Sequence, residues 1–179
     1  MANGRAVISH VVINCFDFGR MVDYYTKTLG FYLSDIGQIG ETQLCFLTFD
    51  PEAEHHQLAL TGGRKGKPGE TSLNHVCFRL PTYKELQARH EMLKGLGANI
   101  RTVTHGSWLS LYSFDPEGNQ IEFRYDLPWY VGQPFARPID LTLSEEEIKA
   151  LTIEQHKDNP KFQLISEWRA KAVAELPVA

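Results

Sequence analysis

Residues 8–13 read ISHVVI, and residues 73–78 read LNHVCF. Each stretch is an apolar run typical of a β-strand with a histidine in third place, so His10 and His75 lie 65 positions apart. The same offset separates the phrase FDPE at 49–52 from its second copy at 114–117. A repeat of this length exceeds the periods of solenoid proteins. The sequence therefore predicts two similar modules that together form one site.

Each half of the repeat predicts one strand, one helix and three further strands. The first half opens with ISHVVIN and continues into a helix over 18–29, where apolar residues recur at helical spacing until Gly30 ends the pattern. The second half opens with LNHVCFRL and continues into a helix over 82–96. The remaining extended segments are expected at 31–37, 42–49 and 55–61 in the first half and at 98–105, 108–114 and 120–125 in the second.

The repeat also sets the expected boundaries within a single α+β domain. We expect a first module at 1–61, a Gly-, Pro- and Lys-rich linker at 62–72, a second module at 73–127 and a C-terminal helical extension at 128–179. In the extension, Ser144 precedes Glu147 by three residues, which predicts a helix that opens with a capping box. A last helix is predicted to begin near Asn159 and Pro160, with the proline in its first turn.

Composition excludes several classes of function. The 18 Lys and Arg against 22 Asp and Glu give a net charge of −4, so the chain lacks the basic excess that binding to nucleic acid requires. No apolar run approaches the length of a membrane span. The three cysteines, Cys15, Cys45 and Cys77, lie in apolar strand-like runs and are expected to be buried free thiols. We therefore expect a cytoplasmic protein that binds neither nucleic acid nor membrane.

Two histidines and one glutamate are the candidate metal ligands. His10 and His75 occupy equivalent strand positions, so a paired arrangement of the modules would point both imidazoles into one concave surface. In QIEFRY, strand alternation places Glu122 on the face opposite Ile121 and Phe123. Two histidines and a carboxylate form the facial triad of non-haem Fe(II) oxygenases. Taken singly, a strand histidine is more often structural, but the repeat places the two symmetrically.

At these residues the sequence resembles the vicinal oxygen chelate superfamily, and within it the type I extradiol catechol dioxygenases. The resemblance covers about residues 7–126 and rests on ISHVVIN, YYTKTLGF, LNHVCF and DPEGNQIEF. It implies two βαβββ modules that form an open barrel around one metal site. It also implies a homodimer, since proteins of this superfamily are commonly dimers.

The resemblance further implies catalytic roles for three residues. The second histidine of HHQLAL, His56, matches the catalytic histidine of the extradiol enzymes. Tyr112 in SLY stands ten residues before Glu122, like the tyrosine that touches substrate in the family. His105 stands seven residues before Tyr112 and matches a further histidine that binds substrate, at a spacing closer than the family pattern. His56 would be the acid or base beside bound O2, while Tyr112 and His105 would orient the substrate.

The function implied is extradiol cleavage of a catechol-type aromatic diol by O2 at a mononuclear Fe(II) site. Mn(II) accepts the same nitrogen and oxygen ligands, so the sequence does not choose between the two metals. Nearby aromatic side chains could build a wall for the flat ring, although each is more often ordinary core. These are Trp108, Phe114, Trp129 and Phe135.

Two other functions share this fold. A glyoxalase-like lyase would need a fourth ligand, a glutamate on the last strand of the first module, where the repeat offset places Gln57. A thiol transferase of the fosfomycin-resistance type keeps three ligands but lacks the His-His and SLY features. A metal-free binding protein that sequesters a ligand is the other alternative, although it would not require His10, His75 and Glu122 together.

Overall fold

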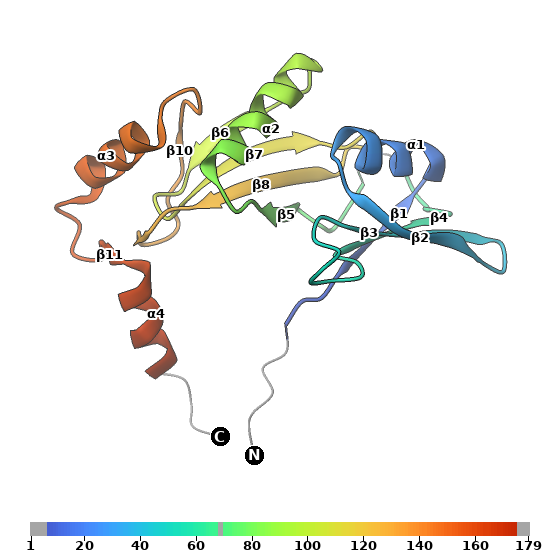
Figure 1. Ribbon diagram of the computed structural model, residues 1–179, viewed down its shortest axis with the longest axis horizontal. Coiled ribbons are helices and arrows are strands. Elements are labelled where there is room, and N and C mark those ends of the chain that lie inside the picture. The colour runs from blue at the N-terminus through green and yellow to red at the C-terminus, as the bar shows by residue number, and fades with distance from the viewer. Residues whose placement is uncertain (1–6, 68–69, 175–179) are drawn as a thin grey trace. The chain divides into compact units, whose positions relative to one another are not determined.

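The computed structural model describes residues 7–67 and 70–174, and they form two compact units (Figure 1). The first unit comprises Met1–Ser72 with Asp115–Asn119, and the second comprises Leu73–Phe114 with Gln120–Ala179. Three parts of the predicted segments lie outside the described residues. They are 1–6 of the first module, 68–69 of the linker and 175–179 of the C-terminal extension.

The first unit contains a four-stranded sheet and one helical segment. Its elements are β1 (Val11–Cys15), α1 (Phe18–Asp23), the π-helical turn η1 (Tyr24–Thr28), β2 (Tyr32–Ile39), β3 (Thr42–Thr48) and β4 (Leu58–Gly62). The strand order is β1-β4-β3-β2, with β1 parallel to β4 and the other neighbours antiparallel. This is the strand, helix and three strands that the sequence predicts.

The helical segment of the first unit buries the apolar residues that predicted it. It begins after Asp17, whose carboxylate accepts a hydrogen bond from the backbone N–H of Arg20. Met21, Tyr25 and Leu29 follow at four-residue spacing, and all three are fully buried. The helical segment ends before Gly30, whose φ of 76° is a conformation that favours glycine.

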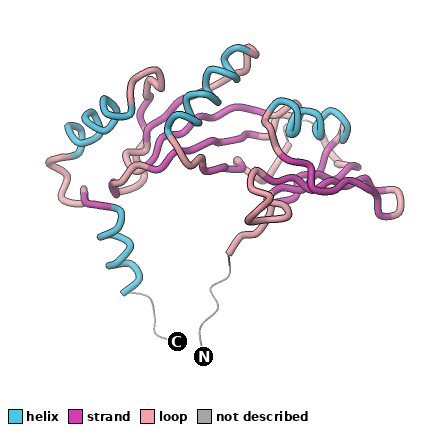
Figure 2. Tube along the Cα trace, in the orientation of Figure 1, coloured by secondary structure: helices cyan, strands magenta, loops and turns pink. Residues whose placement is uncertain are grey.

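The second unit repeats this order and adds a strand from the extension. Its elements are β5 (Val76–Arg79), α2 (Tyr83–Gly95), β6 (Arg101–Thr104), β7 (Trp108–Phe114) and β8 (Gln120–Asp126). The strand order is β10-β6-β7-β8-β5, where β10 (Arg137–Pro138) comes from the C-terminal extension. A capping box between Thr82 and Glu85 opens α2. Figure 2 shows the helices and strands of both units.

The prediction of an α+β chain with two βαβββ modules and a helical C-terminal extension is confirmed. The strand ends differ from the expectation in one respect that matters for the site. His10 and His75 stand immediately before β1 and β5, and His56 lies before β4, so none of the three is inside its strand. Among the described residues, no helix is long and apolar enough to cross a membrane.

The C-terminal extension contains two helices and three two-residue strands. Its elements are β9 (Trp129–Tyr130), β10, α3 (Glu145–His156), β11 (Gln163–Leu164) and α4 (Ile165–Ala174). The predicted capping box of Ser144 and Glu147 opens α3. The prediction that the last helix begins near Pro160 was wrong. Asn159 instead closes a turn onto Phe162, and β11 then pairs with β9, so the helix begins at Ile165.

One free thiol is exposed. Cys15 and Cys45 are buried as predicted, and burial raises the pKa of each thiol, to about 12 and about 11. Cys77 is exposed, so the prediction that it is buried was wrong. It pairs with Glu122 across β5 and β8 and therefore shares the sheet face of that carboxylate.

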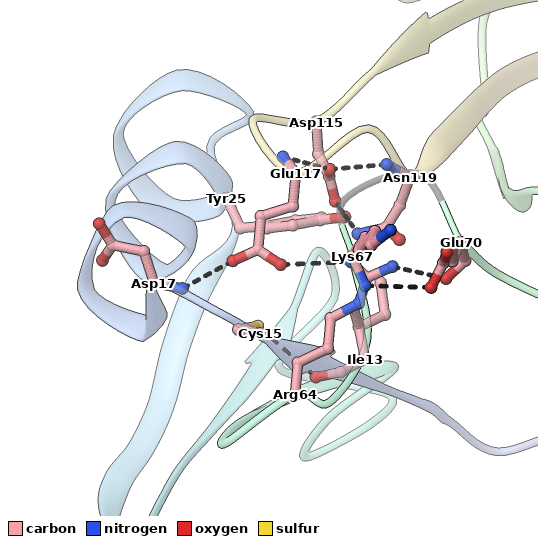
Figure 3. A network of polar contacts seen from close by, with 10 residues as sticks. All are labelled: Ile13, Cys15, Asp17, Tyr25, Arg64, Lys67, Glu70, Asp115, Glu117 and Asn119. Atoms are coloured by element: carbon pink, nitrogen blue, oxygen red, sulfur yellow. Dashed lines mark hydrogen bonds and ion pairs between the residues drawn. The ribbon is translucent and has the colours of Figure 1, made fainter.

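The turn between β7 and β8 belongs to the first unit, although both strands belong to the second. Figure 3 shows how this segment, Asp115–Asn119, is held. The Tyr25 hydroxyl donates to the carboxylate of Asp115 at 3.2 Å. The carboxylate of Glu117 lies 3.3 Å from the guanidinium of Arg64, and both side chains are almost fully buried. The second FDPE phrase is therefore a structural anchor.

His156 makes the stability of the extension sensitive to acid. Its ring is buried between Phe135 and Phe162, and its Nε2 has no hydrogen-bond partner among the described residues. Burial lowers the pKa of His156 below its ordinary value of 6.5. As the pH falls below that value, the unfolded chain binds a proton that the folded chain does not. The free energy of unfolding therefore decreases with acidification.

We expect His156→Leu to reduce this acid sensitivity. Chemical denaturation at pH 7.5 and pH 5.5 should show a smaller loss of unfolding free energy for the variant than for the unmodified protein. An identical loss in both proteins would show that His156 is not the group responsible.

Candidate functional site

Parallel pairing of β1 with β4 brings two predicted site histidines together in the first unit. The backbone N–H of Val11 donates to the carbonyl of Gln57, which places the residues before the two strands side by side. The rings of His10 and His56 consequently lie 4.4 Å apart between centroids. The ring of Phe46 on β3 packs edge-on against His56 at 4.9 Å. A predicted metal ligand and a predicted acid–base residue are therefore neighbours.

The two members of the His-His pair face different partners. The Nε2 of His55 contacts the carboxylate of Asp35 at 2.9 Å on an exposed part of the unit. The Nδ1 atoms of His55 and His56 lie 3.0 Å apart. Burial, and then the neighbouring His10 and His55, lowers the pKa of His56. His56 is thus kept neutral to lower pH than an ordinary histidine, as a proton acceptor must be.

In the second unit, the ring of His75 contacts the carboxylate of Glu122. The Nε2 of His75 lies 2.9 Å from Oε2 of Glu122, which is almost fully buried. The Nδ1 of His75 lies 2.7 Å from Oδ1 of Asn74. An amide oxygen only accepts, so this contact assigns a proton to Nδ1 and aims Nε2 at the carboxylate. Histidine ligands of metals are commonly oriented in this way by a partner on the other ring nitrogen.

Tyr112 and His105 lie beside that pair. Tyr112 pairs directly with Glu122 across β7 and β8, and its ring meets His75 edge-on at 5.7 Å. The Nδ1–H of His105 donates to the carbonyl of Phe135 at 2.8 Å, so its Nε2 is free to accept from the Tyr112 hydroxyl at 3.2 Å. Burial, followed by the charge of Glu122, raises the pKa of Tyr112. A neutral tyrosine hydroxyl therefore stands next to the predicted ligands.

Only part of the predicted aromatic wall lies at this face. Trp108 stacks on the ring of His105 at 4.8 Å, with the two planes 24° apart. Phe114 is 45% exposed. Trp129 and Phe135 are half-buried and pack against Phe162 and His156 of the extension. Trp108 and Phe114 share the face of β7 that carries Tyr112, and Trp108 is the one that lies against a predicted site residue.

Two polar residues at the site were missed by the sequence analysis. The Ser110 hydroxyl donates a short hydrogen bond to Oε1 of Glu122, and Asn74 orients His75. Strand alternation in WLSLYSF could have found Ser110, because it places Ser110 and Tyr112 on one face. Asn74 carries no comparable signal beyond its position before His75.

The six predicted ligands and catalytic residues, which are four histidines, one glutamate and one tyrosine, are divided between the units. The first unit brings together His10 and His56, and the second brings together His75, Glu122, Tyr112 and His105. Among the residues that the structure describes, no group of three or more His, Cys, Asp and Glu side chains is arranged to hold a metal ion.

The first module offers no glutamate equivalent to Glu122. In the second unit Cys77 of β5 pairs with Glu122 of β8, and the corresponding pair in the first unit is Val12 with Ala59. The offset that placed Gln57 opposite Glu122 was wrong by two residues, because the chain between the strands is shorter in the second module. Neither Gln57 nor Ala59 carries a carboxylate, so the fourth ligand of a glyoxalase site is missing from β4.

Comparisons with known proteins agree with this fold. Over 162 residues the chain is 31% identical to biphenyl-2,3-diol 1,2-dioxygenase 2 of Rhodococcus globerulus, which covers 80% of this chain and 82% of that protein. It is 32% identical to biphenyl-2,3-diol 1,2-dioxygenase 3 of the same organism, over 66% of this chain and 63% of that protein.

A solved domain from Frankia sp. EAN1pec, a glyoxylase/bleomycin resistance protein/dioxygenase domain, matches with a TM-score of 0.59 at 17% identity. The match covers 69% of this chain and all of that domain, and it shows a shared fold. The family model named Glyoxalase/Bleomycin resistance protein/Dioxygenase superfamily matches residues 7–123, a range that contains His10, His75 and Glu122. The chain belongs to this superfamily.

Proposed function

We propose that the protein cleaves an aromatic diol with O2 by extradiol ring opening at a mononuclear Fe(II) site. The observation that carries the proposal is the group on one face of the second sheet, where a His75–Glu122 pair stands beside a Tyr112–His105 pair. The similarity to biphenyl-2,3-diol dioxygenases supports the same reaction class.

The donor atoms of the second unit fit a divalent metal. Nε2 of His75 and Oε2 of Glu122 are 2.9 Å apart, close to the separation of two adjacent ligands around a cation with bonds of about 2.1 Å. Nδ1 of His75 carries the proton that is donated to Asn74, so Nε2 of His75 is an acceptor, as is Oε2 of Glu122. Two acceptors at this distance need either a second proton on the ring or a cation between them. His10 is the proposed third ligand. Bound Fe(II) would lower the pKa of a diol hydroxyl and would pass electrons from the diol to O2.

Tyr112 and His105 would orient the diol and hold its proton. The Tyr112 hydroxyl donates to Nε2 of His105, so its oxygen lone pairs remain available to accept from a substrate hydroxyl. The carbonyl of Phe135 fixes the ring of His105 through Nδ1. A proton that leaves the diol can therefore pass to Tyr112 while the tyrosine proton moves to His105. Tyr112 is buried and His105 is half-buried, which limits the access of water to this pair.

His56 would act as the acid–base group for the oxygen half of the reaction. Its lowered pKa leaves the imidazole neutral near pH 7, and the contact with His10 places it next to a proposed ligand. We expect His56→Ala to lower kcat by about 100-fold while Fe(II) binding is kept. His55→Ala is the matched control, because His55 turns toward Asp35, and it should lower kcat less than tenfold. Equal losses in the two variants would contradict the role of His56.

The proposal is tested by anaerobic loading of the purified protein with Fe(II), followed by air and biphenyl-2,3-diol. Oxygen uptake with a new yellow absorption band supports ring cleavage, and parallel loading with Mn(II) identifies the active metal. Stoichiometric Fe(II) binding without uptake on a panel of catechols would contradict the proposal. So would uptake that is unaffected by His75→Ala.

A further inference from the structure

A cavity of about 590 Å³ in the second unit has no assigned role. It lies between the face of β7 and β8 that carries Trp108 and Arg124 and the part of the extension that carries Tyr130 and Trp168. The volume is in the range of small-molecule sites in proteins. None of the proposed ligands lines it, so it is a neighbour of the proposed site and not the site itself.

The cavity is positively charged in an acidic protein. Arg79, Arg124 and Arg169 line it, and Asp126 is its carboxylate. Asp126 contacts both Arg124, at 2.8 Å, and Arg79, at 3.5 Å. One carboxylate is thus shared by two guanidinium groups, and a third arginine stands on the exposed helix α4. The lining carries two positive charges in excess, although the whole chain carries a net charge of −4.

Flat aromatic surfaces stand next to these charges. The guanidinium of Arg124 lies 5.1 Å from the centre of the Trp108 ring. Tyr130 and Trp168 stack at 5.0 Å with planes only 9° apart, which joins α4 to β9 at the wall of the cavity. A ligand that fits this lining combines a flat apolar part with an anionic group.

Strand register connects the cavity to the proposed site. Glu122, Arg124 and Asp126 alternate onto one face of β8, and Tyr112 and Trp108 share the same face of β7. Two residues along a strand span about 7 Å. A substituent that points along the strands from a diol ring near Glu122 and Tyr112 would therefore reach Trp108 and Arg124.

We propose that the cavity binds an acidic substituent, so that the substrate is an aromatic diol with a carboxylate on a short side chain. The placement of the diol rests on the proposed function, but the recognition of an aromatic carboxylate by the cavity does not. Guanidinium groups bind carboxylates through two parallel hydrogen bonds. An uncharged substituent, such as a second phenyl ring, would cover these arginines without supplying any hydrogen-bond acceptor. Part of the desolvation of the guanidinium groups would then be uncompensated, which weakens binding.

The cavity is tested first without metal or diol. 3-Phenylpropionate and the uncharged 3-phenylpropanol are titrated into metal-free protein, and binding is followed through the fluorescence of the lining tryptophans and by calorimetry. We expect the acid to bind at least about tenfold more tightly than the alcohol. Equal affinities, or no binding of the acid, would overturn the proposal.

Variants assign the binding to the arginines. Arg124→Gln should weaken binding of 3-phenylpropionate about tenfold and leave 3-phenylpropanol unchanged. Arg169→Gln, on an exposed helix where folding is not at risk, should act in the same direction. Lys84→Gln removes the same charge from the exposed face of α2 and is the matched control. If both arginine variants bind the acid like the control, the cavity is not the site.

A second comparison separates this inference from the proposed function. The Fe(II)-loaded protein is assayed with 3-(2-carboxyethyl)catechol and the uncharged 3-propylcatechol, and kcat/KM should favour the acid about tenfold, with the preference lost in Arg124→Gln. Selective binding of 3-phenylpropionate with no cleavage of either catechol would contradict the proposed function and support the assignment of the cavity. Cleavage of both catechols with equal kcat/KM would overturn the assignment and leave the function.

Discussion

Replacing Glu122 with glutamine is expected to abolish stoichiometric Fe(II) binding and to lower diol cleavage by more than about 100-fold. Loss of partners that merely orient metal ligands typically costs 10–100-fold, so loss of the ligand charge should cost more. The carboxylate is 4% exposed and receives contacts from both His75 and Ser110. Its negative charge is the one that a cation bound beside His75 would neutralise.

The control is chosen to separate loss of the ligand from loss of charge. Glu91→Gln removes the same charge from an exposed position on α2, where the carboxylate contacts His90. It should leave iron content and turnover unchanged. Iron content is measured by metal analysis after gel filtration, and turnover by O2 uptake. Retention of both iron and activity by Glu122→Gln would remove this residue from the site.

Replacing Asp115 with alanine is expected to lower the free energy of unfolding by about 3 kcal/mol. The buried carboxylate accepts from four donors, which are the Tyr25 hydroxyl, the side-chain amide of Asn119 and the backbone N–H groups of Glu117 and Asn119. Each buried donor left without an acceptor costs about 1–3 kcal/mol. For a chain of this length the loss corresponds to a fall in Tm of roughly 6–12 °C.

The repeat supplies the control for this variant. Asp50 stands at the same place in the first FDPE phrase, but it is exposed and accepts a backbone N–H from Ala53 at 3.3 Å. Asp50→Ala should lower Tm by less than half as much. Burial raises the pKa of Asp115, so its charge is not fully compensated, and Asp115→Asn should cost less than Asp115→Ala. Equal falls in Tm for the two alanine variants would show that the buried hydrogen bonds of Asp115 contribute no more stability than the exposed contact of Asp50.

Much of the fold follows from local signals in the sequence. Helical spacing around Met21 and Tyr25, and the capping boxes at Ser144 and before α2, each specify an element through contacts within a few residues. The position of the last helix did not follow, because Gln163 and Leu164 are drawn into a strand by pairing with β9, far away in the sequence. Local patterns do not report a partner of that kind.

The sequence predicts which residues are candidates for the site, but it does not predict which residues surround them. The 65-residue offset and strand alternation identify His10, His75 and Glu122 as equivalent or facing residues. Exposure of Cys77 and the role of Ser110 depend on which face of the sheet is left open, which the apolar run around each residue does not reveal. The arginine cavity depends on β9 and α4, whose placement comes from tertiary packing.

Extradiol cleavage inserts both atoms of O2 into an aromatic diol, and mass spectrometry of the product tests for this most directly. Fe(II)-loaded protein is given biphenyl-2,3-diol or 3-(2-carboxyethyl)catechol in separate reactions, each with a measured amount of O2. We expect one O2 to be consumed for each diol cleaved and a yellow, ring-opened acid whose mass is that of the diol plus one O2. A quinone with hydrogen peroxide, or recovery of both diols unchanged from protein that has bound its iron, would contradict this reaction.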